Sequence, residues 1–372
     1  MPPFACPNCR RLVHFEVRVC PACRFTLGYD PASDRFLFLG DGATTWRDAE
    51  GAGHDVMVCR NNDDHGVCNW LVATDDDTPF CRACRHNRTI PDLSVPTVSE
   101  RWGRIEAAKR RLFHTLIRLG LPLETQAEAQ RDGTGQGLAF DFLYDPSAEE
   151  HQNPQILTGH DGGVITLNLI EADDAARERI RREMGEPYRT LLGHFRHEAG
   201  HHYWERLVDK GGEIQSFRAV FGNETADYRT ALQNHYGNGG NGWTTDYVSA
   251  YATSHPWEDF AETFAHLLHM VDTLATLGGF GARLDPFPGP EAHAGPEVSF
   301  DPYVASTDAL VGQWMPFAFA LNAINRSMGL PDLYPFHLSP AIVRKIDYVN
   351  GLIKTPLPLG EREGPKPTGL GG

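Results

Sequence analysis

The spacing of apolar residues predicts helices on both sides of a small sheet in the middle of the chain. Residues 101–119 carry apolar side chains at helical spacing, and a glycine and a proline end the pattern. Residues 137–144 and 163–170 are predicted as strands, and the second alternates in part between apolar and polar residues after a glycine-containing turn. The charged residues 173–184 predict a further helix, so this region indicates an α+β fold.

The C-terminal part is predicted to be mostly helical. A helix begins at Pro256 and carries an apolar stripe that we assign to the core. Residues 306–328 and 339–352 predict two more helices, the first with a kink or a break at Pro316. The intervening residues 280–300 are rich in proline and glycine, which predicts irregular structure.

Residues 188–209 predict the helix that carries the chemistry, because they contain His197-Glu198-Ala199-Gly200-His201. Side chains four residues apart lie on one face of a helix, so His197 and His201 can bind one metal ion. Glu198 lies close enough to take a proton from a metal-bound water. Gly200 weakens a helix by about 1 kcal/mol relative to alanine, so packing or function must compensate. The alternative is a surface helix rich in histidine and glutamate. The apolar residues around the motif predict that the helix is buried, and buried histidines need hydrogen-bond or metal partners.

Two downstream glutamates compete for the place of a third metal ligand. Glu262 lies one helical turn after Glu258. The Glu262 carboxylate can accept a hydrogen bond from a ligand histidine and so orient its ring. Glu224 lies nearer to His201 in the sequence, but the residue one turn after it is Tyr228. We therefore favour Glu258 as the ligand and expect Glu224 to form a salt bridge or to cap a helix.

These segments resemble known metallopeptidases. The HExxH helix with a later helical glutamate is similar to the gluzincins, and Tyr251, seven residues ahead of Glu258, together with Glu262 resembles the catalytic segment of anthrax lethal factor. That resemblance implies that Glu258 binds zinc and that Tyr251 assists catalysis. Across residues 1–350 the chain resembles a bacterial family of zinc-binding metallopeptidases with an N-terminal zinc-ribbon domain. The resemblance implies a zincin-like metallopeptidase domain, mostly helical with a small sheet, preceded by small zinc-ribbon modules.

All eight cysteines lie before residue 85, in two sets of four. The first set forms two Cys-x-x-Cys pairs: Cys6, Cys9, Cys20 and Cys23. The second set is less regular: Cys59, Cys68, Cys81 and Cys84. Four such thiolates can close a tetrahedral site, so each set predicts one structural zinc ion, with His65 as an alternative ligand to Cys59 or Cys68. A disulfide framework and a redox dithiol are weaker alternatives.

The cysteine sets and a proline-containing linker divide the chain into four predicted segments. Residues 1–38 form a zinc ribbon, residues 39–92 a second zinc-ribbon module, residues 99–354 the metallopeptidase domain and residues 355–372 a disordered tail. The net charge of −15 argues against nucleic acid as a partner, although a protein partner could dock on the ribbons. No apolar run is long enough to span a membrane and no signal peptide precedes the first cysteines, so we expect a cytoplasmic protein.

The sequence therefore predicts a zinc peptidase with one catalytic and two structural zinc ions and a peptide or protein substrate. Glu198 acts as the general base, and Tyr251 donates a hydrogen bond to the oxyanion, with His255 as the alternative donor. Residues Val164–Leu169 are our candidate edge strand for binding an extended peptide. The alternative function is a non-catalytic, zinc-stabilised protein that docks a protein or nucleic acid. Glu198 argues against it, because a binding protein needs no base beside the metal.

Overall fold

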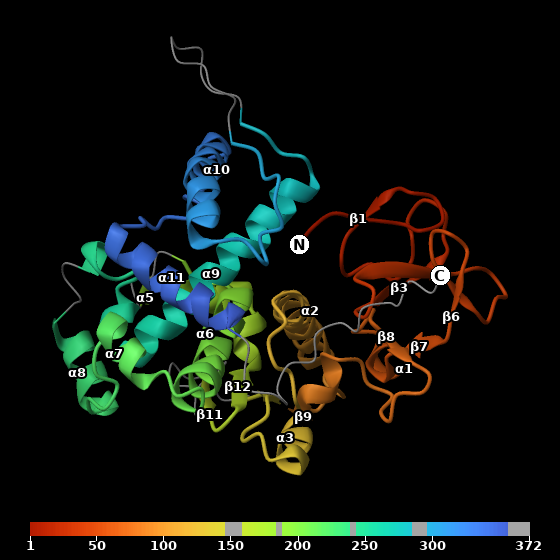
Figure 1. The fold of residues 1–372 in the computed structure, drawn as a ribbon. Coiled ribbons are helices and arrows are strands. Elements are labelled where there is room, and N and C mark those ends of the chain that lie inside the picture. Colours follow the sequence, from red (N-terminus) through yellow and green to blue (C-terminus); the bar gives the residue numbers. More distant parts are fainter. Residues whose placement is uncertain (146–157, 184–187, 239–242, 285–295, 356–372) are drawn as a thin grey trace, which may run out of the picture.

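The computed structural model describes residues 1–145, 158–183, 188–238, 243–284 and 296–355. Within these ranges helices predominate, and the strands form two four-stranded and two two-stranded sheets. The predicted α+β class is thus confirmed. Figure 1 shows the N-terminal strands on one side and most helices on the other, with α2 (Pro96–Arg118) between them. None of the described helices combines the length and the apolar character that a membrane span requires.

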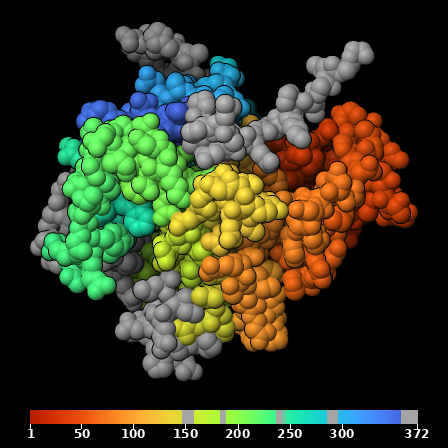
Figure 2. Space-filling model, turned by 60° about the horizontal axis from the view of Figure 1, so that its bottom comes forward, coloured from red at the N-terminus to blue at the C-terminus, as the bar shows by residue number. Residues whose placement is uncertain are grey.

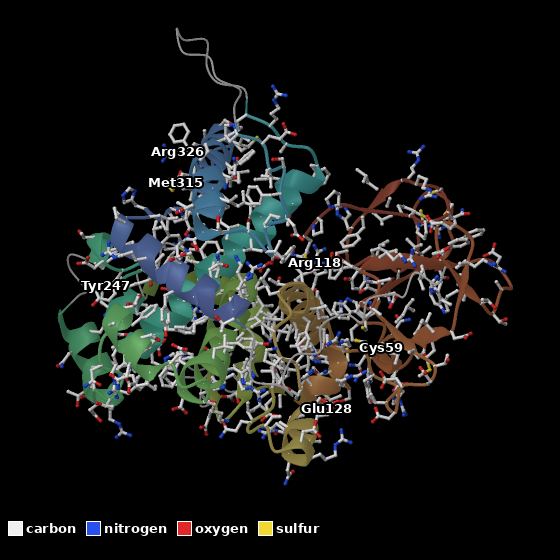
Figure 3. All side chains as sticks on the ribbon, in the orientation of Figure 1. Cys59, Arg118, Glu128, Tyr247, Met315 and Arg326 are labelled. Atoms are coloured by element: carbon white, nitrogen blue, oxygen red, sulfur yellow. The ribbon has the colours of Figure 1, made fainter. Side chains whose placement is uncertain are left out.

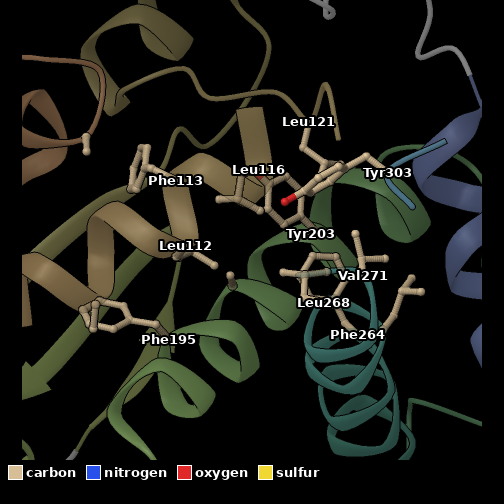
Figure 4. Close-up of a cluster of buried hydrophobic side chains, with 14 of the residues drawn as sticks. Leu112, Phe113, Leu116, Leu121, Phe195, Tyr203, Phe264, Leu268, Val271 and Tyr303 are labelled. Atoms are coloured by element: carbon tan, nitrogen blue, oxygen red, sulfur yellow. The ribbon is translucent and has the colours of Figure 1, made fainter. Parts of the chain in front are cut away.

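Three helices form the core beneath the site: α2, α6 (Leu191–Trp204) and α9 (Pro256–Gly279). Figure 4 shows side chains of all three helices in one buried cluster: Leu112, Leu116, Phe195, Tyr203, Phe264 and Leu268. Gly200 of α6 lies against α9, where an added Cβ would stand 2.8 Å from the Cα of Ala261. The close packing of α6 on α9 therefore requires the glycine inside the HExxH motif. This packing compensates for the free energy that a glycine costs the helix.

The helix boundaries differ from the prediction at the central helix. α6 begins at Leu191, where the Thr190 hydroxyl accepts a hydrogen bond from the Gly193 backbone, and not at residue 188. After Trp204 the chain continues as a π-helical turn, Glu205–Asp209. We predicted a kink or a break at Pro316, and the break was wrong, because α10 (Thr307–Ser327) runs through this proline.

The other described α-helices are α1 (Arg60–His65) in the cysteine-rich region, α3 (Gln126–Asp132), α5 (Asp174–Glu183), α7 (Ile214–Phe221), α8 (Tyr228–Asn238) and α11 (Pro340–Lys354). Residues 285–295 of the segment predicted to be irregular lie outside the described residues. Residues 356–372 of the predicted tail lie outside them as well.

A four-stranded sheet contacts α6 through its strand β11 (Gly159–Asp161). β12 (Val164–Asn168) pairs in parallel with β10 (Ala139–Leu143) on one side and antiparallel with β11 on the other. The prediction that Val164–Leu169 forms an edge was therefore wrong, because this strand has a neighbour on each side. β11 takes the edge position instead, and within the described ranges no strand pairs with its outer side.

The other edge of this sheet comes from the cysteine-rich region. β9 (Asn87–Thr89) begins three residues after Cys84 and pairs in parallel with β10. The remaining N-terminal strands are short: β1 (Phe4–Ala5), β2 (Leu12–Val13), β3 (Thr26–Asp30), β4 (Arg35–Leu39), β5 (Trp46–Arg47), β6 (Gly53–His54), β7 (Val56–Val58) and β8 (Leu71–Ala73). Figure 2 shows this part, coloured red to orange, gathered on one side of the molecule. The cysteine-rich region thus lies against the helical part and supplies one strand to its sheet.

Candidate active site

α6 and α9 bring three candidate ligands together. His197 and His201 lie one turn apart on α6, and Glu258 lies in the first turn of α9. Glu258 Oε2 is 3.0 Å from His197 Nε2 and 3.2 Å from His201 Nε2, and the two Nε2 atoms are 3.2 Å apart. Ligand atoms bound at about 2.0–2.1 Å to a tetrahedral zinc ion stand roughly 3.3 Å from one another. The three atoms therefore form a triangle of the size that one zinc ion requires.

Two carboxylates set the charge of this triad. Glu262 Oε1 lies 2.6 Å from His197 Nδ1, and hydrogen bonds with Glu258 and Glu262 raise the pKa of His197 against the effect of its burial. A metal ion at Nε2 would take the place of the proton there and leave the Nδ1 proton donated to Glu262. Burial by itself would raise the pKa of Glu258, but the charge of His201 and hydrogen bonds with both histidines hold that pKa well below its usual range. A carboxylate oxygen thus faces imidazole nitrogens in a buried site. This donor set fits zinc.

Two further side chains hold the candidate ligands in place. The Ser249 hydroxyl donates to Glu262 Oε2 over 2.6 Å, which fixes the carboxylate behind His197. The Tyr228 hydroxyl donates to Glu258 Oε1 over 2.5 Å and leaves Oε2 to face the histidines. Burial and the negative charge of Glu258 raise the pKa of Tyr228, so its hydroxyl keeps the proton that it donates.

Sequence reasoning missed the role of Tyr228, which it treated only as a neighbour of Glu224. Tyr228 is the first residue of α8 and lies 30 residues before Glu258, so no helical spacing relates the two. Only the fold of the segment between them brings the hydroxyl to the carboxylate. No signal in a single sequence would have identified this contact.

A cavity of about 270 Å³ opens beside the triad. Its walls include His197, Glu198, Tyr251 and Glu262, together with Thr158, which immediately precedes β11. Glu198 is buried, and it is not one of the three converging ligands. The cavity thus brings a carboxylate and a phenol to the candidate metal position, next to the edge strand of the sheet.

Two alternatives weighed from the sequence are engaged elsewhere. His255 is the N-cap of α9: its Nδ1 accepts from the Trp257 backbone at 3.1 Å, and its Nε2 lies 3.1 Å from the Ala226 carbonyl oxygen. Glu224 pairs with Arg218 through two contacts, of 2.8 and 2.5 Å. Neither side chain belongs to the converging triad.

The eight cysteines form two compact groups, each with all four sulfur atoms within 4.8 Å of one another. In the first group Cys6 Sγ and Cys23 Sγ are 3.7 Å apart, and Cys9 Sγ and Cys20 Sγ are 3.6 Å apart. A disulfide would bring two sulfur atoms to about 2.05 Å, whereas thiolates on one tetrahedral zinc ion stand roughly 3.8 Å apart. The geometry therefore fits zinc and excludes disulfides within this group.

The second cysteine group is fully buried and lies against α2. Cys68 Sγ is 3.8 Å from both Cys81 Sγ and Cys84 Sγ. Cys84 Sγ is 3.6 Å from Glu106 Oε2 of α2. The four cysteines complete this group without His65, whose ring packs against Trp102. Since α2 is also part of the core beneath the triad, this group adjoins the elements that carry the site.

Comparisons with known proteins agree with this geometry. A family model described as putative zinc-binding metallo-peptidase matches residues 98–352, and a zinc-ribbon domain model matches residues 3–95. Uncharacterized proteins of Mycobacterium tuberculosis and Mycobacterium bovis are each 39% identical to the chain over 354 residues, which covers 94% of this chain and 94% of theirs. No solved structure gives a significant match.

Proposed function

The chain belongs to the putative zinc-binding metallo-peptidase family, and we propose that it hydrolyses peptide bonds with a zinc-activated water. The observation that carries this proposal is the convergence of His197, His201 and Glu258 beside a cavity that Glu198 also lines. The HExxH helix, the later glutamate-bearing helix and the mixed sheet with an antiparallel edge strand support a zincin-like fold of the gluzincin type.

Each residue around the cavity has a definite task in the proposed reaction. A zinc ion held by the triad would polarise the scissile carbonyl and acidify a water molecule. Glu198 takes the proton of that water and later delivers it to the leaving amine. Tyr251 donates a hydrogen bond to the oxyanion that develops on the carbonyl. Glu262 and Tyr228 keep the ligand atoms aimed at the metal.

The edge strand β11 offers a place for the substrate backbone. An extended peptide can add to the free side of a sheet through main-chain hydrogen bonds. Thr158, which immediately precedes β11, lines the cavity, and the His160 ring of β11 stacks near the His201 ring at a centroid distance of 6.3 Å. A peptide along β11 would therefore run past the candidate metal position. We propose β11 as the peptide-binding strand.

We also infer that both cysteine groups hold structural zinc. Cys84 of the second group contacts Glu106 of α2 and lies three residues before β9, which is a strand of the sheet that reaches the cavity. Metal in such a small module commonly contributes directly to its folding free energy. We therefore assign the second group a structural role in the peptidase fold.

An unbiased peptide-library digest tests the proposed activity. We expect the purified, zinc-loaded protein to cleave a subset of internal peptide bonds, and a chelator that empties the catalytic site to stop the cleavage. Mass spectrometry of the products measures both results. A zinc-loaded protein that cleaves no library member would contradict the proposal and favour the non-catalytic docking protein.

The hydroxyl of Tyr228 gives a second testable result. In Tyr228→Phe, Glu258 loses the hydrogen bond that fixes its Oε1, so the catalytic site should bind zinc roughly 10- to 100-fold more weakly. Tyr348→Phe is the matched control, because it removes a hydroxyl that contacts Ser216 and not the triad. Competition with a calibrated chelator measures the affinity. Equal zinc affinity in the parent and Tyr228→Phe would rule out the positioning role.

A further inference from the structure

The cavity beside the triad extends along the groove between α6 and α9. On α6, Gly193 lies one helical turn before His197 and lines the cavity. We call the part of the cavity around Gly193 its far end. The other walls of the far end are four rings, from the segment before α6, from α9 and from the segment after α10: Tyr188, His266, His269 and Phe336. The proposed reaction gives this end of the cavity no task.

The four rings pack edge to face around the far end. Tyr188 contacts His269 at a centroid distance of 5.2 Å and Phe336 at 6.1 Å. His266 contacts the same two rings, Phe336 at 4.5 Å and His269 at 6.0 Å. Aromatic rings attract one another in this arrangement, because the positive edge of one ring meets the negative face of the next. A wall of this kind favours another aromatic ring as its guest.

Gly193 leaves room beside these rings. A Cβ on Gly193 would stand 3.4 Å from Tyr188 Cε1 and 3.7 Å from His269 Nε2. It would also stand 3.0 Å from the hydroxyl oxygen of Thr190, which caps the helix. The side chain of any other residue at this position would therefore enter the far end. A glycine costs a helix about 1 kcal/mol relative to alanine, and here it keeps the far end open.

The charges around the far end are balanced within the chain. Arg189 lines the cavity and pairs with Glu171 at 3.1 Å. The guanidinium of Arg196 donates a hydrogen bond to His269 Nδ1, so His269 is neutral and carries its proton on Nε2. Burial lowers the pKa of His266 to about 4, so this ring is neutral at neutral pH as well. The far end therefore suits a neutral side chain.

We propose that the far end binds the aromatic side chain of a substrate phenylalanine or tyrosine next to the scissile bond. This specificity rests on the proposed peptidase function. One helical turn, about 5.4 Å, separates Gly193 from His197, so a residue held at the metal position can reach the far end with its own side chain. A lysine or arginine side chain would instead approach Arg189 and Arg196, and the like charges would repel.

A series of peptides tests the substrate class. The series takes a sequence cleaved in the library digest and varies the residue on each side of the cleaved bond. At one of these two positions, we expect the zinc-loaded protein to show a roughly 100-fold higher kcat/KM for phenylalanine or tyrosine than for alanine. Lysine and glutamate should do no better than alanine. Equal kcat/KM for phenylalanine and alanine at both positions, or a preference for a charged residue, overturns the proposal.

Gly193→Leu tests whether the far end is the source of the selectivity. The leucine side chain fills the far end, so the preference for phenylalanine over alanine should fall by about tenfold or more. Gly351→Leu is the matched control, because a Cβ at this position of α11 would meet no atom within 4 Å. A preference that Gly193→Leu leaves intact contradicts the assignment.

Zinc content and thermal unfolding show whether Gly193→Leu still folds. Figure 3 shows Cys59, of the second cysteine group, on the other side of α2 from α6 and α9, so the substitution lies away from that group. We expect the zinc content and the melting temperature to stay close to those of Gly351→Leu. A lower selectivity in a variant that keeps its zinc and its fold supports the aromatic site.

A binding measurement separates failure of this proposal from failure of the proposed function. Hydroxamates bind zinc directly, so phenylalanine hydroxamate and alanine hydroxamate compare the two side chains without catalysis. By calorimetry, we expect the zinc-loaded parent to bind phenylalanine hydroxamate roughly tenfold more tightly, and Gly193→Leu to lose this difference. A parent that cleaves no peptide but shows the difference refutes the peptidase and retains the aromatic site. Equal affinities in a parent that cleaves no peptide overturn both proposals.

Discussion

Glu198→Gln is expected to keep its zinc and to lose several orders of magnitude in kcat. Glutamine has the shape of glutamate but cannot take a proton from water at neutral pH, so only the proton transfer is removed. Glu198 lines the cavity and does not belong to the triad whose atoms lie 3.0–3.2 Å apart. The zinc content should therefore stay at the parent value. Rates on a peptide found in the library digest, with elemental analysis of the same samples, measure both quantities.

A matched control separates loss of the base from general damage to the protein. Glu100→Gln makes the same chemical change on α2, at a residue that pairs with Arg104 at the surface. It should leave kcat, zinc content and thermal stability unchanged. Parent-like cleavage by Glu198→Gln would show that another group takes the proton. Loss of zinc along with activity would assign Glu198 a part in metal binding.

The features that the sequence anticipated depend on short-range spacing. His197 and His201, like Glu258 and Glu262, are four residues apart, and the geometry of one helix is enough to put each pair on one face. The two cysteines of each Cys-x-x-Cys pair are likewise close in the sequence, and in the structure the sulfur atoms of all eight cysteines form two groups. The sequence also placed α2 and α9 correctly in outline. A long apolar stripe at helical spacing indicates a helix whatever the tertiary arrangement around it.

The features that it missed depend on contacts between distant segments. Whether β12 forms an edge depends on whether β11 pairs with it, and the alternation of apolar residues in β12 is the same in both cases. The contact of Tyr228 with Glu258 depends on the path of the chain between α8 and α9. The position of β9 in the sheet is a third example. The strand is only three residues long, Asn87–Thr89, and its sequence carries no strand signal of its own.

Glu258→Ala is expected to remove one zinc ion from each chain and leave the other two. Two cysteine groups and one triad predict about three zinc ions in the parent protein. Glu258 supplies one of the three atoms of the triad. Alanine has no oxygen that could take the place of this buried carboxylate. The cysteine groups contain no residue of α9, so their zinc should stay bound. Elemental analysis after exhaustive dialysis should give about two zinc ions per chain.

Glu224→Ala is the control that distinguishes the two candidate ligands. Glu224 competes with Glu258 on sequence grounds, yet its carboxylate contacts Arg218 at 2.8 and 2.5 Å. Removing it should therefore leave all three zinc ions and the peptidase rate in place, and only an ion pair at the surface is lost. The opposite pattern, with zinc lost in Glu224→Ala and retained in Glu258→Ala, would reverse the assignment. A parent protein with one zinc ion and eight titratable thiols would show that neither cysteine group binds zinc. The effect of Glu258→Ala on that single zinc ion would then decide whether the ion belongs to the triad.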